Sequence, residues 1–489
     1  MKQLELREYQ KLIRDFIIPT PRCNIWADCG LGKTAATISA LQHFLPKVPV
    51  LVVAPPRVAR EVWPDEVKEW AQFKGIKTVS INALPLSHRE YLLNSPPPPG
   101  TIYTISYNIV QWLAYHMNKK KWAWPVIIAD ESSKLRSYRR GGGTLTARCM
   151  AMLAARAERF VGLTASPGTK GLKDLWGQMW YIDGGKRLGA SFKDFADRWF
   201  HSEPVYRQGK LIQSAERLTP KPGAEEEILS LISDVVLRVA TEDWFDLEKP
   251  IHVNVPIHLP EKIQKAYAKM EATMVTEVRA AGLDLEMEII APNASARSHK
   301  CYQLAQGTVP EEGGQGYHVI HDLKLEALQE IIDENEGKNI IVVYRYVTDS
   351  KHILNKIKGS RRLGGAGSTP QSDSQTIAAW NMGEVPVLVM NALSGGHGLN
   401  LQHGGSIMVF YSHDFNTEAY QQVMERIGPA RQAASGYKRN VFMYHLITQN
   451  TLDELPLAVV SGDLEQQTRI LAGVKSKHGL SQPAVAEKV

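Results

Sequence analysis

Two short segments in the first third of the chain carry side chains suited to phosphate and metal chemistry. The first, residues 27–34, reads ADCGLGKT and follows an apolar run typical of a strand. Its small residues let backbone N–H groups face phosphate oxygens, while Lys33 suits the β- and γ-phosphates and the Thr34 hydroxyl suits Mg²⁺. The second segment ends another apolar run with an acidic pair. Asp130 is predicted to hold Mg²⁺ through water, and Glu131 to orient and deprotonate the water that attacks the γ-phosphate.

Each segment has a simpler interpretation when it is taken alone. Gly30 and Gly32 are also consistent with a plain helix entry, and the acidic pair with solvated charge at a strand end. The first segment departs from the pattern GxxxxGK[ST], because Ala27 occupies the first glycine position. A helix-forming run follows at 35–41, however, and the two segments together predict a nucleoside-triphosphate site.

The composition indicates a cytoplasmic protein of more than one domain. A chain of 489 residues is too long for one ordinary core, so two domains, or three, are expected. No window approaches the roughly 18 uninterrupted apolar residues of a membrane span, and the N-terminus lacks the apolar segment of a signal peptide. The net charge of +6 permits a polyanionic partner. The cysteines show no Cys-x-x-Cys pair and are expected to be reduced thiols, at Cys23, Cys29, Cys149 and Cys301.

Short apolar runs alternate with amphipathic stretches in two separate series, which predicts two α/β lobes with parallel sheets. The first series lies at 50–54, 101–105, 126–129 and 159–163. The second lies at 339–344, 387–390, 407–410 and 441–444.

The interval between these series is richer in helical patterns and contains an expected loop at 218–224. A boundary near residue 245 is predicted within it. The resulting division is an N-terminal lobe at 1–245, a C-terminal lobe at 246–472, and a polar tail at 473–489 that is expected to be disordered.

Motifs in the second series complete a resemblance to a known family. They are SGGHGLNL at 394–401, DFNT at 414–417, and Gln422 followed by Arg426. In this order the chain resembles superfamily 2 helicases, most closely the Swi/Snf-like DNA translocases in their compact bacterial or bacteriophage form. The resemblance implies two tandem RecA-like lobes with helical insertions. It also implies ATP hydrolysis with Mg²⁺ in the inter-lobe cleft, and movement along double-stranded DNA that remodels DNA or protein–DNA complexes.

The resemblance also assigns roles to individual residues. Nucleotide contacts are implied for Gln10, which would read adenine, for Gly30, Leu31, Gly32, Lys33, Thr34 and Ala35, and for Gly398. Coupling of hydrolysis to lobe movement is implied for Ser133, Thr164, Ser166 and Gln422. Contacts with nucleic acid are implied for Arg57, Ser106, Tyr107 and Asn400. A monomer in a bacterial or phage-infected cell is expected, with a protein partner for targeting left open.

Two departures from the family pattern affect these assignments. Ser133 replaces the histidine that usually follows the acidic pair, and a serine can still donate a hydrogen bond. Pro429 stands where the family usually has a second arginine, and Arg431 is the nearest substitute. Arg426 and Arg431 are therefore assigned jointly to the arginine finger, the alternative being that one of them is only an exposed helix charge.

Two other functions remain consistent with the sequence. One is a helicase that separates strands of DNA or RNA, and the other is a nucleic-acid-binding scaffold without turnover. The intact Lys33, Thr34, Asp130 and Glu131 argue against the scaffold.

Overall fold

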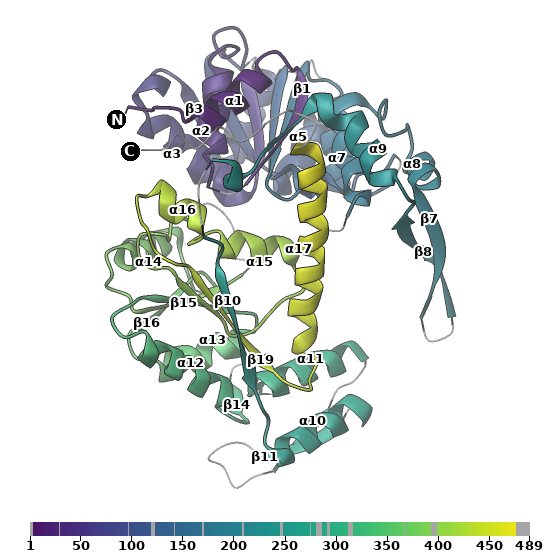
Figure 1. Cartoon of the computed structure of the whole chain (residues 1–489). Coiled ribbons are helices and arrows are strands. Elements are labelled where there is room, and N and C mark those ends of the chain that lie inside the picture. The colour runs from purple at the N-terminus through teal and green to yellow at the C-terminus, as the bar shows by residue number, and fades with distance from the viewer. Residues whose placement is uncertain are drawn as a thin grey trace, which may run out of the picture. The chain divides into compact units, whose positions relative to one another are not determined.

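The chain folds into two compact units, Met1–Asp246 together with Asp463–Val489, and Leu247–Gly462. We call them the first lobe and the second lobe; each contains its own parallel sheet (Figure 1). The computed structural model describes residues 3–475 except 29, 96, 119–122, 141, 169–170, 208–209, 245–247, 274, 280–285, 291–293, 312–315, 366 and 393–398.

The first lobe is organised around a seven-stranded parallel sheet in the order β3-β4-β2-β5-β6-β1-β9. Its strands are β1 (Arg22–Ala27), β2 (Val50–Ala54), β3 (Lys77–Ser80), β4 (Thr101–Ser106), β5 (Val126–Asp130), β6 (Arg159–Thr164) and β9 (Val236–Val239). Its helices are α1 (Glu8–Ile17), α2 (Lys33–Leu41), α3 (Trp63–Glu69), α4 (Leu86–Asn94), α5 (Val110–Met117), α6 (Leu145–Ala154), α7 (Lys173–Asp183), α8 (Phe192–Trp199) and α9 (Ala224–Ile232).

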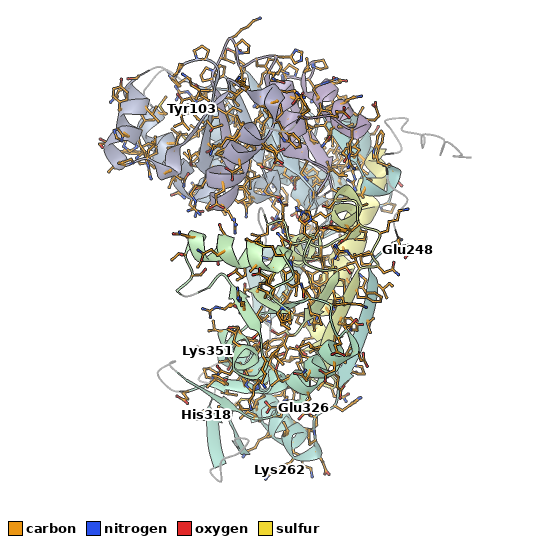
Figure 2. All side chains as sticks on the ribbon, turned by 90° about the vertical axis from the view of Figure 1, so that its left-hand side faces the viewer. Tyr103, Glu248, Lys262, His318, Glu326 and Lys351 are labelled. Carbon is orange, nitrogen blue, oxygen red and sulfur yellow. The ribbon has the colours of Figure 1, made fainter. Side chains whose placement is uncertain are left out.

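Both faces of this sheet are covered, which explains why its central strands are apolar at every position. Alternate residues of β2 point to opposite faces: Leu51 and Val53 join one hydrophobic cluster, and Val50 and Val52 join the other. Tyr103 of β4, labelled in Figure 2, packs edge-on against the buried Trp124 with ring centroids 5.8 Å apart. The α/β interpretation of the sequence is confirmed for this lobe.

A β-hairpin is the main feature of the first lobe that the sequence analysis did not anticipate. Strands β7 (Phe200–Arg207) and β8 (Lys210–Pro220) pair only with each other and extend away from the sheet (Figure 1). The loop expected at 218–224 is wrong in its first part, because Leu218–Pro220 pair with Phe200–Ser202. Pro220 favours a turn, but it lies with Leu218 and Thr219 in a strand because cross-strand pairing decides the conformation of all three.

The second lobe contains a six-stranded parallel sheet in the order β10-β19-β18-β15-β17-β16. Its strands are β10 (Ile251–Ile257), β15 (Ile340–Tyr344), β16 (Ser360–Leu363), β17 (Val387–Asn391), β18 (Ile407–Phe410) and β19 (Phe442–Thr448). Two short ribbons pair β11 (Val275–Arg279) with β12 (Glu286–Ile290), and β13 (Thr308–Pro310) with β14 (Tyr317–Val319). The helices are α10 (Glu261–Thr273), α11 (Ala294–Gln306), α12 (Leu323–Glu334), α13 (Val347–Lys356), α14 (Pro370–Asn381), α15 (Thr417–Met424) and α16 (Pro429–Ala434). A further helix, α17 (Glu454–Lys475), begins in the second lobe, and its residues from Asp463 onward belong to the first.

The polar tail predicted from residue 473 begins inside α17, which continues to Lys475. Residues 476–489 lie outside the described part of the chain. No helix among the described residues combines the length and apolar character needed to cross a lipid bilayer.

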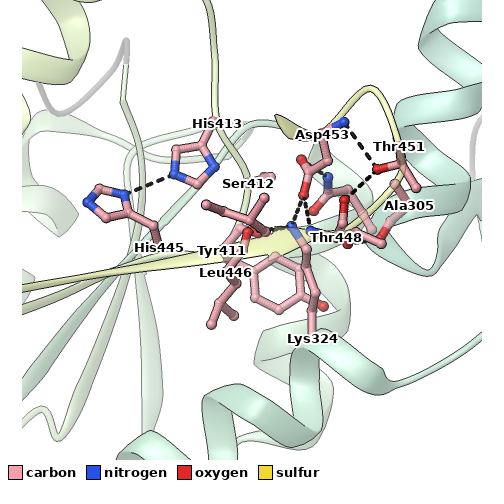
Figure 3. A network of polar contacts seen from close by, with 12 residues as sticks. Ala305, Lys324, Tyr411, Ser412, His413, His445, Leu446, Thr448, Thr451 and Asp453 are labelled. Atoms are coloured by element: carbon pink, nitrogen blue, oxygen red, sulfur yellow. Dashed lines mark hydrogen bonds and ion pairs between the residues drawn. The ribbon is translucent and has the colours of Figure 1, made fainter. Parts of the chain in front are cut away.

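A buried ion pair joins distant segments of the second lobe (Figure 3). Lys324 Nζ lies 2.6 Å from Asp453 Oδ2 and donates to the carbonyl oxygens of Tyr411 and Leu446, each at 2.9 Å. Burial by itself would raise the pKa of Asp453, but the Lys324 ammonium and the backbone N–H of Thr448 hold that pKa below its usual range. The pair thereby fixes α12 against the ends of β18 and β19.

Three histidines form a hydrogen-bonded chain across the same sheet. His445 of β19 lies 3.0 Å from His252 of β10 and 3.1 Å from His413, measured between ring nitrogens. Phe410 stacks on the His445 ring at 5.1 Å. Burial lowers the pKa of His413 to about 4, and burial together with its two histidine neighbours lowers that of His445 to about 2.

These lowered pKa values predict that acid destabilises the second lobe. The unfolded chain binds the proton at a pKa of about 6.5, whereas the folded histidines resist it, so the free energy of unfolding falls as the pH drops below about 6.5. Each buried histidine is expected to cost about 2 kcal/mol at about pH 5. Urea denaturation at about pH 7.5 and 5 should show that His445→Phe has a smaller acid-induced loss than the parent. The exposed His258 provides the control as His258→Gln, and an equal loss in parent and His445→Phe would contradict the assignment.

Candidate nucleotide site

The two segments singled out for phosphate chemistry lie at one edge of the first-lobe sheet. β6 is hydrogen-bonded to β1 on one side and to β5 on the other. The register places Trp26 opposite Thr164, and Asp130 opposite Leu163. Because carboxyl ends of parallel strands meet at the same edge, residues 27–34 and the acidic pair lie on either side of the end of β6.

The phosphate loop has the backbone geometry that its glycines permit. Gly30 and Gly32 have φ angles of 84° and 68°, in the left-handed region where a side chain is strained. A Cβ at Gly32 would lie 2.3 Å from Gln10 Nε2, and that amide donates to the Leu31 carbonyl oxygen at 3.2 Å. Gln10 therefore closes one side of the loop, and α2 begins directly after it at Lys33.

Lys33 spans the loop internally. Its Nζ donates to the carbonyl oxygens of Ala27 at 2.7 Å and Asp28 at 3.0 Å. A second cation braces the loop from β9, where Arg238 forms a 2.8 Å ion pair with Asp28 and donates to the Trp26 carbonyl at 3.2 Å. Asp28 also accepts a hydrogen bond from the backbone N–H of Thr241 at 2.8 Å.

Asp130 is buried and its carboxylate has two fixed donors. Trp63 Nε1 donates to Oδ2 at 2.9 Å, and the backbone N–H of Glu131 donates to Oδ1 at 3.1 Å. Burial raises the pKa of Asp130, while the Trp63 hydrogen bond and the Lys33 ammonium oppose this shift.

The backbone at Glu131 is strained. Its φ of 57° is left-handed, which is uncommon for a residue with a side chain and typical of functional turns. The next residues form a short helical turn, η5 (Ser132–Leu135), in which Ser133 is fully buried. A Cβ at Gly162 of β6 would lie 3.1 Å from Ser132 Oγ, so this glycine allows the acidic turn to pack closely on β6.

The predicted coupling segment follows β6 directly. Thr164 and Ser166 are buried, and Thr164 Oγ1 accepts a hydrogen bond from the Ser166 backbone N–H at 3.0 Å. The segment therefore lies between the phosphate loop and the acidic pair, and its coupling role stays a prediction.

The residues predicted to contact nucleic acid in this lobe differ in accessibility. Arg57 is partly exposed and forms a 3.0 Å ion pair with Glu61. Ser106 is fully buried, and Asn82 Nδ2 donates to its hydroxyl at 2.7 Å. The buried Tyr107 donates its hydroxyl to the Asp130 carbonyl at 2.9 Å. The side chains of Ser106 and Tyr107 thus make internal contacts and that of Arg57 is partly exposed, while the contact with nucleic acid stays a prediction for all three.

In the second lobe, the two candidate finger residues converge on one carbonyl. Arg426 and Arg431 donate to the Leu399 oxygen at 3.4 and 3.2 Å, and Arg431 also donates to Asn400 Oδ1 at 2.9 Å. Pro429 begins α16, at a position where the N–H that proline lacks would have no partner within the helix. This explains how a proline can stand where the family usually has the second arginine.

Two further assignments in this lobe concern Gln422 and Gly398. Gln422 is buried on α15, with Nε2 3.4 Å from Glu418 Oε1. Gly398 lies outside the described residues.

The arrangement in the first lobe fits a nucleoside triphosphate and a divalent cation. The left-handed backbone at Gly32 disfavours a side chain, the backbone N–H groups at the start of α2 are suited to phosphate, and Asp130 supplies a carboxylate at the end of a nearby strand. Trp63 had no motif-based prediction for this site, because its contribution depends on strand order rather than on spacing along the chain.

Comparison with known proteins agrees with this geometry. The sequence profile of the SNF2-related domain matches residues 22–302, and that of the helicase conserved C-terminal domain matches residues 323–431. The chain belongs to the SNF2-related family. It is a Swi/Snf-like, nucleic-acid-dependent ATPase with tandem RecA-like lobes.

Individual relatives show different extents of similarity. Putative protein p41 of Acyrthosiphon pisum secondary endosymbiont phage 1 is 36% identical over 98% of this chain and 100% of its own length. Chromodomain-helicase-DNA-binding protein 1-like of Danio rerio and the ISWI chromatin-remodeling complex ATPase ISW1 of Saccharomyces cerevisiae are each 22% identical, over 88% and 87% of this chain. The chain spans only 40% and 37% of those two proteins. A solved structure, the Sulfolobus solfataricus SWI2/SNF2 ATPase core in complex with dsDNA, has a TM-score of 0.42 and 20% identity, covering 96% of this chain and 97% of that one.

Two substitutions should separate nucleotide binding from hydrolysis at this site. Glu131→Gln is expected to bind ATP with near-parent affinity but to lower kcat by at least about 100-fold, because an amide cannot accept the proton of the attacking water. Lys33→Ala should weaken ATP binding as well, since the ammonium is lost. Steady-state hydrolysis and binding of a fluorescent ATP analogue would check both, and parent-rate hydrolysis by Glu131→Gln would exclude the water-activating role.

Proposed function

We propose that this protein is an ATP-dependent translocase on double-stranded DNA that remodels DNA or protein–DNA complexes. The observation that carries the proposal is the convergence of a phosphate loop, a coupling segment and an acidic pair at the ends of β1, β6 and β5, in a chain of the SNF2-related family. Similarity to a protein named as a chromatin-remodeling complex ATPase adds support for remodelling activity.

In the proposed reaction, the first lobe binds ATP and activates water. The loop at 30–35 holds the phosphates, with Lys33 on the β- and γ-phosphates, and Glu131 takes the proton of the attacking water. Thr34 and Asp130 would hold Mg²⁺, which supplies charge neutralisation to the phosphate oxygens.

Positive charge from the second lobe completes the proposed mechanism. Arg426 and Arg431 stabilise the charge that develops on the transferred phosphoryl group. Because that contribution requires the two lobes to close on ATP, hydrolysis and release alternate with opening. Alternating grip of the two lobes on DNA phosphates then produces movement.

Backbone contacts determine the expected DNA preference. Arg57 in the first lobe and Asn400 in the second are the candidate contacts that remain accessible. Phosphate contacts carry no direct sequence information, so binding should be largely independent of sequence and should weaken steeply with salt.

The proposal predicts that duplex DNA stimulates ATP hydrolysis more than single-stranded DNA or RNA does. The measurement is steady-state hydrolysis without nucleic acid and with each of the three, at one salt concentration, followed by displacement of a third strand from triplex DNA. Stronger stimulation by single strands or RNA would favour the strand-separating helicase. No hydrolysis under any condition would contradict turnover and favour the scaffold.

The arginine assignment has its own test. Arg426→Ala and Arg431→Ala are each expected to lower DNA-stimulated kcat by about 100-fold or more, with a smaller change in ATP affinity, because a finger acts mainly in the transition state. Arg439→Ala is a matched control, since this second-lobe arginine is partly exposed and stacks on Tyr437. Full activity of both test variants would remove the finger role from this segment.

A further inference from the structure

The acidic residue assigned to Mg²⁺ is held by side chains from two neighbouring strand ends. Trp63 follows β2 and donates to the Asp130 carboxylate, whereas Tyr107 follows β4 and donates to the carbonyl oxygen of the same residue, both at 2.9 Å. Both donors are buried, so solvent does not compete for these hydrogen bonds.

Both donors are also close in sequence to residues predicted to contact nucleic acid. Arg57 lies between the end of β2 and a π-helical segment, η1 (Val58–Val62), and η1 leads directly into Trp63. The Arg57–Glu61 ion pair lies within that connection. Tyr107 directly follows Ser106 at the end of β4. A π-helical turn is rare and frequently marks a functional position.

A cross-connection joins these two segments. Thr104 of β4 donates its hydroxyl to the carbonyl oxygen of Ala59 in η1. We therefore expect a displacement of either segment to move the other segment and Asp130.

We propose that Trp63 and Tyr107 are positioning residues that fix Asp130 and link its geometry to DNA at the ends of β2 and β4. This inference rests on the proposed function. A phosphate that engages Arg57 competes with Glu61 for the guanidinium and thereby acts on η1. The Trp63 indole fixes one carboxylate oxygen, yet each oxygen can accept more than one hydrogen bond, which leaves room for metal-bound water.

The chain offers matched control substitutions for both residues. Trp70 directly follows α3, the helix that Trp63 begins, and its Nε1 donates to Glu66 of that helix at 2.7 Å. Trp70→Phe therefore removes an indole–carboxylate bond that does not involve Asp130. Tyr181 is a buried tyrosine that donates to the Ala147 carbonyl at 2.7 Å, so Tyr181→Phe matches Tyr107→Phe. Circular dichroism should confirm folding of all variants, and Tyr107→Phe keeps the proposal testable if Trp63→Phe does not fold.

The first measurement is the affinity of the full-length protein for Mn²⁺, which serves as a probe for Mg²⁺. Binding is detected by electron paramagnetic resonance in the presence of a non-hydrolysable ATP analogue and without DNA. Trp63→Phe is expected to weaken Mn²⁺ binding by about tenfold, and Tyr107→Phe by a smaller factor, because a charge-assisted hydrogen bond contributes more than a neutral one. The two controls should match the parent. Parent-like Mn²⁺ binding in both test variants would overturn the positioning role.

The second measurement is the ratio of kcat with saturating duplex DNA to kcat without it. The ratio should fall by about tenfold in Trp63→Phe, with a KM for ATP within about twofold of the parent. An unchanged ratio, or an equal fall in Trp70→Phe, would overturn the link to DNA. Absence of DNA stimulation in the parent would instead contradict the proposed function, and the Mn²⁺ measurement would still decide the positioning role.

Discussion

Parallel pairing of β1, β6 and β5 is the constraint on which the nucleotide site depends. Three segments that are far apart in sequence become neighbours because their strands share one ladder and end at the same edge. The ladder requires apolar residues on both faces, and the first lobe supplies two separate hydrophobic clusters for them. The hydrophobic core thus fixes the strand ends from which the polar loops extend.

Backbone strain and close packing then adjust the positions of the loops that strand pairing has brought together. Glu131 has a left-handed backbone, Gly162 allows the acidic turn to approach β6, and Arg238 fixes the loop through Asp28. Each of these features acts on a backbone segment rather than on a ligand. The fold therefore positions the backbone of the site, whereas the Lys33 ammonium must exchange its bonds to the Ala27 and Asp28 carbonyls for phosphate oxygens.

The sequence was sufficient to predict the two α/β lobes, since continuous apolar runs and loop motifs are local signals. It was also sufficient to select the phosphate loop and the acidic pair. It did not predict the β7–β8 hairpin, whose pairing depends on contacts between strands, nor the role of Trp63, which depends on how β2 lies beside β5. The burial of the Ser106 and Tyr107 side chains was also not predictable, because spacing along the chain does not reveal which side chains the fold covers.

Gln10 joins the start of the first helix to the phosphate loop through one side chain. Its Oε1 accepts from the Arg7 backbone N–H at 2.9 Å, while its Nε2 donates to the Leu31 carbonyl beside the phosphate loop. A carboxamide has a second N–H and a second lone pair, so both bonds can persist while one donor and one acceptor stay available for a ligand. A movement of the chain at Arg7 would therefore reach the Leu31 carbonyl through this amide, which ties the order of the N-terminal segment to the order of the loop.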